Sequence, residues 1–273
     1  MKLETLKDTP PWDWPQGTGA ALLDILRDGQ AAESDRIIAA ELAGDFTVID
    51  DDLVDALLAI VCSRDASEAL RGQAALSLGP ALEHADTDGF EDESQEPISE
   101  RSFHTIQESL RELFRDKSVP EEVRRRILEA SVRAPQDWHH DAVCAAGRSG
   151  DEAWKLTGVF CMRFVRGFGE EIRQALGSKN PDIRYEAVCA AGQWGVEAAW
   201  PHVAALIATK GTPKRLLLAV IEAVSSIRPQ EASQVLGDLA DSDDEEIVEA
   251  VHEALAMAEG VSSEDDEDDD IRY

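Results

Sequence analysis

Residues 181–195 read PDIRYEAVCAAGQWG, which is a proline-containing turn followed by an amphipathic segment. Proline is favoured in the first turn of a helix, because the N–H it lacks would find no partner there. An apolar stripe then recurs at helical spacing and comprises Ile183, Ala187, Ala190 and Trp194. The two alanines in the middle of the stripe let a neighbouring helix approach closely. This stretch therefore predicts a tightly packed helix that is buried along one side.

The same pattern returns at a nearly constant interval. Five segments begin with a proline or acidic turn, and each continues with an apolar stripe. The residues that open the stripes are separated by 31, 29, 33 and 31 positions, and they are Val123, Trp154, Ile183, Leu216 and Ile247. Shorter amphipathic segments lie between them, as WPHVAALIATKG does at 200–211. A fixed period of this length predicts stacked units of two helices each.

Fainter copies of the pattern occupy the first part of the chain. The interval from Leu70 to Val123 is 53 residues, about 22 more than the later spacing. The excess coincides with residues 86–100, DTDGFEDESQEPISE, which hold seven acids and no base. Such a segment has little to bury, so the sequence predicts a mobile inserted loop that folding does not require.

The repeat resembles a known family. Its turn and second helix follow the pattern (D/N)P-x-(V/I)-R-x-x-A, best seen in NPDIRYEAVCAAGQWG and PEEVRRRILEAS, and this resembles HEAT repeats of the phycobilisome-lyase-like type. The resemblance implies an all-α, right-handed α-solenoid of about seven HEAT-like helix pairs, with the second helices lining its concave side. We expect an N-terminal cap segment at 1–17, the solenoid at 18–259 with its loop at 86–100, and an acidic disordered tail at 260–273.

Charge and composition restrict the classes of function. The net charge of −30 argues against binding nucleic acid or anionic lipid through the whole surface. The charge is segregated, because residues 101–230 have a balance of +3 and the flanks together −33. No signal peptide is expected, since the start MKLETLKDTPPWDWPQ has no apolar core, and no membrane span is expected, since the apolar runs are too short. Four cysteines without CxxC spacing predict a cytoplasmic protein without disulfides.

Two features suggest a site but favour a structural explanation. The hexapeptide AVCAAG occurs at 142–147 and at 187–192, yet Cys144 is predicted in the first helix of a pair and Cys189 in the second. The repetition therefore indicates shared packing requirements. His140 and Cys144 stand four residues apart, opposite a predicted Trp138–Ala142–Ala145 stripe, but zinc needs three or four ligands. An exposed polar face is the favoured interpretation.

One dipeptide is similar to part of an enzyme site. His252-Glu253 resembles the His-Glu pairs of deoxyhypusine hydroxylase, a HEAT-repeat di-iron enzyme whose site requires several such pairs. This chain has one. Nucleophile elbows, phosphate-cradling glycine loops and Ser/His/Asp constellations are also missing from the sequence. No catalytic residue, cofactor or metal is therefore expected.

We predict a non-enzymatic protein-binding scaffold or adaptor that presents its concave helical surface to a protein partner. The alternative is a lyase- or hydroxylase-like HEAT-repeat enzyme or chaperone, acting on a tetrapyrrole or a modified side chain. The hypothetical partner-binding residues form a basic stripe for an acidic partner segment, and they are Arg125, Arg126, Arg133, Arg184, Lys214 and Arg215. The first three are expected to project from the side of their helix opposite Val123.

Both ends of the chain carry unusual segments. Trp12 and Trp14 precede the first repeat, where an end cap must cover an apolar face, so capping is favoured over a displayed aromatic motif. The tail at 262–273 contains seven consecutive acids. A solvated tail is the simpler interpretation. A sharper one is that the tail folds over the basic stripe and competes with the partner.

Overall fold

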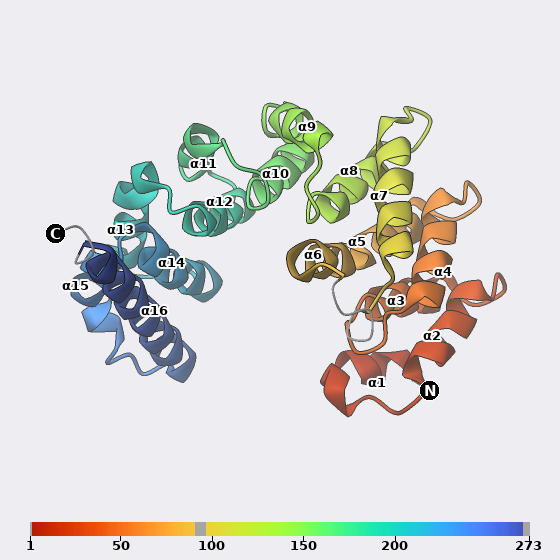
Figure 1. The fold of residues 1–273 in the computed structure, drawn as a ribbon, viewed down its shortest axis with the longest axis horizontal. Coiled ribbons are helices and arrows are strands. Elements are labelled where there is room, and N and C mark those ends of the chain that lie inside the picture. The colour runs from red at the N-terminus through yellow and green to blue at the C-terminus, as the bar shows by residue number, and fades with distance from the viewer. Residues whose placement is uncertain (1, 91–96, 270–273) are drawn as a thin grey trace. The chain divides into compact units, whose positions relative to one another are not determined.

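The structure is built from helices. It is a computed structural model that describes residues 2–90 and 97–269, with side chains described as far as residue 260, and this part of the chain contains no strand (Figure 1). The α-helices in chain order are α1 (Leu3–Lys7), α2 (Thr18–Arg27), α3 (Glu33–Ala43), α4 (Asp51–Cys62), α5 (Glu68–Ser77), α6 (Gly79–Asp88), α7 (Glu100–Arg115), α8 (Glu121–Ser131), α9 (Asp137–Gly147), α10 (Glu152–Cys161), α11 (Gly169–Ala175), α12 (Pro181–Gln193), α13 (Trp200–Ala208), α14 (Lys214–Ile227), α15 (Ala232–Leu236) and α16 (Glu245–Asp269). Short 3₁₀ helices lie at Pro11–Asp13, Glu197–Ala199, Pro229–Glu231 and Gly237–Leu239.

The chain divides into two compact units, residues 1–142 and 143–273. The first contains the helix pairs α2–α3, α4–α5 and α7–α8, and the second contains α11–α12, α13–α14 and α15–α16. The pair α9–α10 lies between these groups in the sequence, and the division falls inside α9. The predicted all-α solenoid of about seven helix pairs is confirmed, with α1 and α6 as additions to the pairs.

Within each unit the second helices of successive pairs pack on one another. In the first unit α3 packs on α5, and α5 on α8. In the second, α10, α12, α14 and α16 follow one another in the same way. Small residues allow this close approach, because a Cβ added at Gly192 of α12 would lie 3.0 Å from Cα of Ala223 in α14. The two alanines that were expected at close helix contacts, Ala187 and Ala190, are fully buried in the same helix as Gly192.

The polar turns predicted from the sequence begin the helices. Each of several turn residues accepts a hydrogen bond from an amide in the first turn, which satisfies a donor that has no partner within the helix. The bonds run from Leu53 N to Asp50 (2.9 Å), Leu70 N to Ser67 (3.2 Å), Ala153 N to Asp151 (2.8 Å) and Asp182 N to Asn180 (3.0 Å). Short polar residues therefore fix where the repeating helices start.

The insert at 86–100 differs from its prediction at both ends. Residues 91–96 lie outside the described residues, but residues 86–88 complete α6. Ile98 is only 1% exposed, and the Ser99 amide donates a 2.9 Å hydrogen bond to the Asp51 carboxylate. One buried isoleucine and one helix cap therefore follow the acidic run, at the end of a segment that was expected to hold few groups to bury.

The segment before the first repeat packs on α3. Leu3 and Leu6 are buried, and the indole N–H of Trp14 lies 2.9 Å from the Thr9 carbonyl and 3.1 Å from the Leu6 carbonyl. Trp12 is 78% exposed. The capping role expected for both tryptophans therefore fits Trp14 and not Trp12.

The last helix extends further than the predicted end of the solenoid. α16 passes residue 259 and ends at Asp269, so it enters the segment predicted as a disordered tail. Residues 270–273 of that segment lie outside the described residues. No helix in the described ranges is both long and apolar enough to cross a membrane.

Candidate functional site: a groove over α14 and α16

Two helix faces meet along a groove in the second unit. The lining residues of α16, from Glu246 to Met257, recur at intervals of three and four along the helix. On α14, Leu218 and Glu222 line the groove four residues apart. Residues at these intervals share one side of a helix. The two rows, with Tyr185 of α12, line a cavity of about 830 Å³, which we call the α14–α16 groove.

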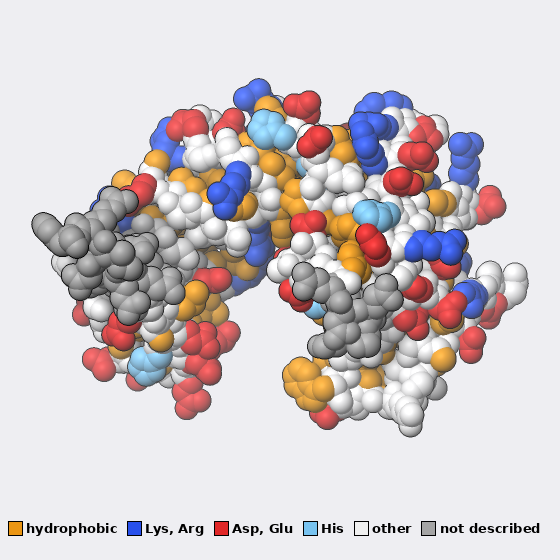
Figure 2. Space-filling view, viewed as in Figure 1, with side chains coloured by type: hydrophobic (Ala, Val, Ile, Leu, Met, Phe, Trp, Pro, Cys, Tyr) orange, Lys and Arg blue, Asp and Glu red, His pale blue; other side chains and the backbone are white. Residues whose placement is uncertain are grey.

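The groove has an apolar base and an exposed apolar residue at one end. The base includes Ala219, Ala250 and Ala254, whose short side chains leave space between the two helices. Leu218 is half-buried, whereas Met257 is 57% exposed. A large apolar side chain at that exposure is unusual in this chain, because within the described residues only Trp12 and Phe46 resemble it. Figure 2 shows hydrophobic and acidic side chains next to one another where α14 and α16 begin.

Acidic side chains outnumber basic ones around the groove. Four glutamates and two basic residues line it, which gives the lining a net charge of −2. Glu222, Glu249 and Glu253 are exposed, and their carboxylates form no hydrogen bond or ion pair within the described part of the chain. The fourth, Glu246, is paired. The groove therefore has three carboxylates that a partner can neutralise.

Both basic residues of the groove are engaged within the chain. Nζ of Lys214 lies 2.7 Å from Asp244 and 2.6 Å from Glu246, and hydrogen bonds to these two carboxylates raise the pKa of Lys214. The guanidinium of Arg215 lies 3.8 Å from the centre of the Tyr185 ring, a cation–π contact. Arg215 also lies 3.8 Å from a carboxylate oxygen of Asp182. Neither cation is available without breaking these contacts.

The residues of the predicted basic stripe are distributed over both compact units. Arg125, Arg126 and Arg133 belong to the first unit, and Arg184, Lys214 and Arg215 to the second. Of the second group, only Lys214 and Arg215 line the α14–α16 groove. Arg184 is half-buried, and its Nε is a buried atom without a hydrogen-bond partner within the described residues.

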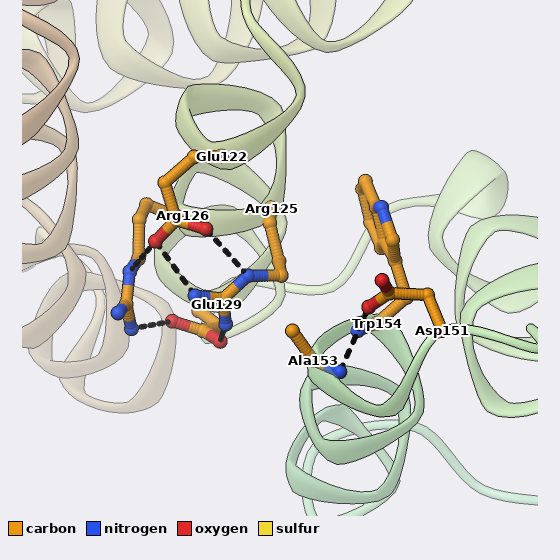
Figure 3. A network of polar contacts seen from close by, with 7 residues as sticks. All are labelled: Glu122, Arg125, Arg126, Glu129, Asp151, Ala153 and Trp154. Atoms are coloured by element: carbon orange, nitrogen blue, oxygen red, sulfur yellow. Dashed lines mark hydrogen bonds and ion pairs between the residues drawn. The ribbon is translucent and has the colours of Figure 1, made fainter.

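Arg125 does not project into solvent, which corrects the expectation for α8. Arg125 is 7% exposed and Glu129 9% exposed, and their side chains are joined at 2.9 Å. Glu122 binds Arg125 at 2.6 Å and Arg126 at 3.0 Å (Figure 3). Carboxylates three residues before and four after Arg125 neutralise it in place, and this permits its burial. These four side chains form an internal network, which we call the α8 network.

The α8 network also shifts the acidity of two of its members. Burial opposes ionisation of Glu122, but hydrogen bonds and charge from Arg125 and Arg126 outweigh it and hold the pKa of Glu122 below its usual value. Burial likewise opposes the charge on Arg126, and Glu129 and Glu122 outweigh it, so the pKa of Arg126 is raised. Glu122 and Arg126 are therefore charged together, and the network compensates their charges internally.

Arg133 and Arg126 pack their aliphatic stems on glycines. A Cβ at Gly79 would lie 2.8 Å from Cδ of Arg133, and one at Gly72 would lie 3.2 Å from Cγ of Arg126. The guanidinium of Arg133 pairs with Glu83 of α6. Arg126 of α8 thus contacts α5, and Arg133, which follows the end of α8, contacts α6, a role in packing that long side chains perform well.

The phase of α9 differs from its prediction by one residue. Trp138 and Ala142 are half-buried and Ala145 is exposed, whereas His139, Val143 and Ala146 are buried. The histidine is accommodated because both ring nitrogens have partners, Gln136 N at 2.8 Å and Ser131 Oγ at 3.0 Å. Sequence periodicity alone favours tryptophan over histidine as the buried residue.

The metal candidates do not gain a third ligand within the described residues. His140 is exposed and Cys144 half-buried, and His252 and Glu253 are exposed. Within the described residues, no three or more His, Cys, Asp or Glu side chains are grouped so that they can hold a metal ion. Cys144 lies in α9 and Cys189 in α12, so the two AVCAAG copies occupy the first helix of one pair and the second helix of another, as expected.

The groove itself is not among the sites expected from the sequence. Its signal is present in α16, where Glu246, Glu249 and Glu253 alternate at intervals of three and four with Ala250, Ala254 and Met257. Apart from Ala254, this row does not belong to the predicted stripe that Ile247 opens. A row of small and acidic residues ending in methionine is an unusual helix face, but only the neighbouring α14 shows that the row borders a groove.

Comparison with protein families identifies the repeats around the groove. The family model of HEAT repeats matches residues 169–256. This part of the chain consists of HEAT repeats. The match begins with α11 and includes the first part of α16. It therefore contains the groove apart from Met257, which is one residue beyond it. The predicted resemblance to HEAT repeats is confirmed.

Solved structures provide further similarities. The YibA protein of Escherichia coli is 16% identical, with 90% of this chain and 84% of that chain covered and a TM-score of 0.48. Human deoxyhypusine hydroxylase is 17% identical, with 94% of this chain and 88% of that chain covered and a TM-score of 0.40. An engineered protein is 14% identical, with 94% of this chain and 70% of that chain covered and a TM-score of 0.48. No curated protein sequence matches the chain.

Proposed function

We propose that this protein is a non-enzymatic adaptor that holds a protein partner in the α14–α16 groove. The observation that carries the proposal is the exposed Met257 at the end of a groove whose other walls are helix faces with unpaired carboxylates. Partner surfaces are enriched in exposed, adaptable apolar residues surrounded by polar ones. HEAT repeats are arrays of helices that present extended surfaces of this kind.

The dimensions of the groove suit a segment of polypeptide. Its lining on α16 extends from Glu246 to Met257, which is about 16 Å at 1.5 Å per residue. Three turns of a helix cover that length. The basic-stripe hypothesis is less well supported, because Arg125, Arg126 and Arg133 all form ion pairs within the first unit. We therefore place the partner on the groove and not on the α8 surface.

Affinity capture from the native host with the wild-type protein and one groove variant tests the proposal. Met257→Asp introduces a charge at the exposed apolar end of the groove. Ala256→Asp introduces the same charge at the neighbouring exposed residue of α16, which does not line the groove. We expect a protein that wild type and Ala256→Asp retain and that Met257→Asp loses, with purified components giving the same order of affinities. Equal retention by all three proteins would contradict the groove as the binding site.

A second measurement separates the adaptor from the enzymatic alternative. Protein purified from its own host is analysed for metal content and for visible absorbance. The adaptor proposal expects neither stoichiometric metal nor a chromophore. Stoichiometric iron would contradict it in favour of a hydroxylase-like activity, and a bound tetrapyrrole would contradict it in favour of a lyase or chaperone.

A further inference from the structure

We infer that the segment held in the α14–α16 groove is a basic amphipathic α-helix of the partner. The inference rests on the proposed function, since it names the chemistry of the segment that binds at the same site. Three properties of the groove lead to it: the charge of its rim, the state of its two cations, and the form of its apolar surface.

The rim of the groove is negatively charged and not compensated by the chain. Glu222, Glu249 and Glu253 form no ion pair within the described residues, and they lie on two facing helices. A partner that carries Lys or Arg places opposite charges beside these carboxylates, whereas an acidic partner adds like charges. The rim therefore attracts a basic segment.

The two cations of the groove do not favour an acidic partner. Lys214 is held between Asp244 and Glu246, and Arg215 lies on Tyr185 and close to Asp182. An acidic segment would have to replace existing ion pairs, which exchanges equivalent contacts and provides little net free energy. A basic segment leaves these contacts in place. The charge of the groove thus selects between the two kinds of partner.

The apolar surface requires more than positive charge. Leu218 and Met257 flank a base of three alanines, so the groove contacts an apolar ridge as well as cations. A helix with apolar residues at intervals of three and four presents such a ridge, with Lys or Arg on either side of it. A small polyvalent cation would leave Met257 exposed. The combination fits an amphipathic helix of about three turns.

Selection from a random peptide library tests the chemistry of the bound segment directly. Phage-displayed random peptides of about 16 residues, a little over four helical turns, are selected on the full-length protein and, in parallel, on Met257→Asp. Circular dichroism checks that the variant remains folded. We expect peptides enriched on wild type to carry Lys or Arg together with apolar residues at helical spacing, and to be depleted on Met257→Asp.

The other outcomes separate this inference from the proposed function. Enrichment of acidic or uncharged peptides that still depend on Met257 would overturn the basic helix and leave the groove as a protein-binding site. Equal enrichment on wild type and Met257→Asp would overturn both. Failure to enrich any peptide on the wild-type protein would overturn the inference as well.

Paired substitutions test the role of the carboxylates directly. A synthetic peptide from the selection is titrated by fluorescence anisotropy against Glu249→Gln/Glu253→Gln and against Glu245→Gln/Glu259→Gln. The second pair lies on the same helix and removes the same charge but does not line the groove. We expect about tenfold weaker binding for the first pair, which corresponds to two exposed ion pairs, and little change for the second. Equal weakening by both pairs would show attraction to overall charge and overturn the assignment.

Discussion

Gln136 and His139 are joined by a hydrogen bond in which the Gln136 backbone amide donates to Nδ1 of the histidine over 2.8 Å. Because Nδ1 accepts, the neutral ring carries its proton on Nε2, which donates to Ser131 Oγ at 3.0 Å. The ring is 1% exposed and stacks on Trp138 with 3.8 Å between ring centres. The start of α9 thus encloses a neutral histidine in the core of the first unit.

This histidine predicts acid sensitivity. Burial lowers the pKa of His139 from 6.5 to about 4. The folded-state pKa lies below the unfolded one, so the stability that His139 contributes is complete above pH 6.5 and is lost as the pH falls toward 4. Between about pH 7 and about pH 4.5, we expect wild type to lose roughly 2–3 kcal/mol more than His139→Gln. Urea unfolding of both proteins at the two pH values measures this, and equal losses would contradict the prediction.

The α8 network predicts a large effect from one buried carboxylate. Glu129→Ala leaves the buried Arg125 with Glu122 as its remaining partner in the network, and we expect the free energy of unfolding to fall by about 2–3 kcal/mol. Glu108→Ala makes the same substitution at an exposed position of α7 and should change the free energy of unfolding by less than about 0.5 kcal/mol. Denaturant melts compare them. If the two variants were equally stable, the network would have no structural role.

Close helix contact predicts intolerance of a methyl group at Gly158. A Cβ there would lie 2.7 Å from Cα of Gly147, so α10 and the end of α9 would have to move apart. We expect Gly158→Ala to destabilise the protein by about 2 kcal/mol or more. Gly29→Ala is the matched control, because its Cβ would meet nothing within 4 Å. Thermal unfolding compares the two variants. If Gly158→Ala lowered the melting temperature no more than Gly29→Ala, the helices would adjust to the added methyl group without cost.

The insert at 86–100 allows a prediction about how much its last residues contribute to the stability of the first unit. Ile98 is 1% exposed, and we expect Ile98→Ala to destabilise the first unit by about 2–4 kcal/mol. A deletion of 86–97 removes the last turn of α6 and should also lower the melting temperature, contrary to the expectation from sequence. Differential scanning calorimetry checks both. Unchanged melting temperatures for both variants would show that the segment is dispensable for folding.

The repeat was predictable because its signal is local. Ile183, Ala187 and Ala190 lie within eight residues, and their burial follows from helix geometry alone. Proline and short polar residues at the turns likewise determine helix starts through contacts over two or three residues. These features do not depend on which other helix is adjacent.

Other features depend on neighbours that spacing does not reveal. Arg125 was expected in solvent because it lies away from Val123, but ion pairs along α8 permit its burial. His139 lies outside the stripe predicted for its helix, and two polar partners make its burial possible. The α14–α16 groove combines residues from Tyr185 to Met257 on three helices, so no single segment displays it.

The position of α16 at the end of the stack has a consequence for local opening. Its packing is mainly on α14 and on the 3₁₀ helix Pro229–Glu231, and no further repeat follows it within the described residues. In a solenoid each helix pair is stabilised chiefly by its immediate neighbours, so the terminal pair detaches from the stack most readily. We therefore expect amide hydrogen exchange in α16, which forms one wall of the groove, to be faster than in α12 and α14. An occupant that bridges α14 and α16 would slow that exchange.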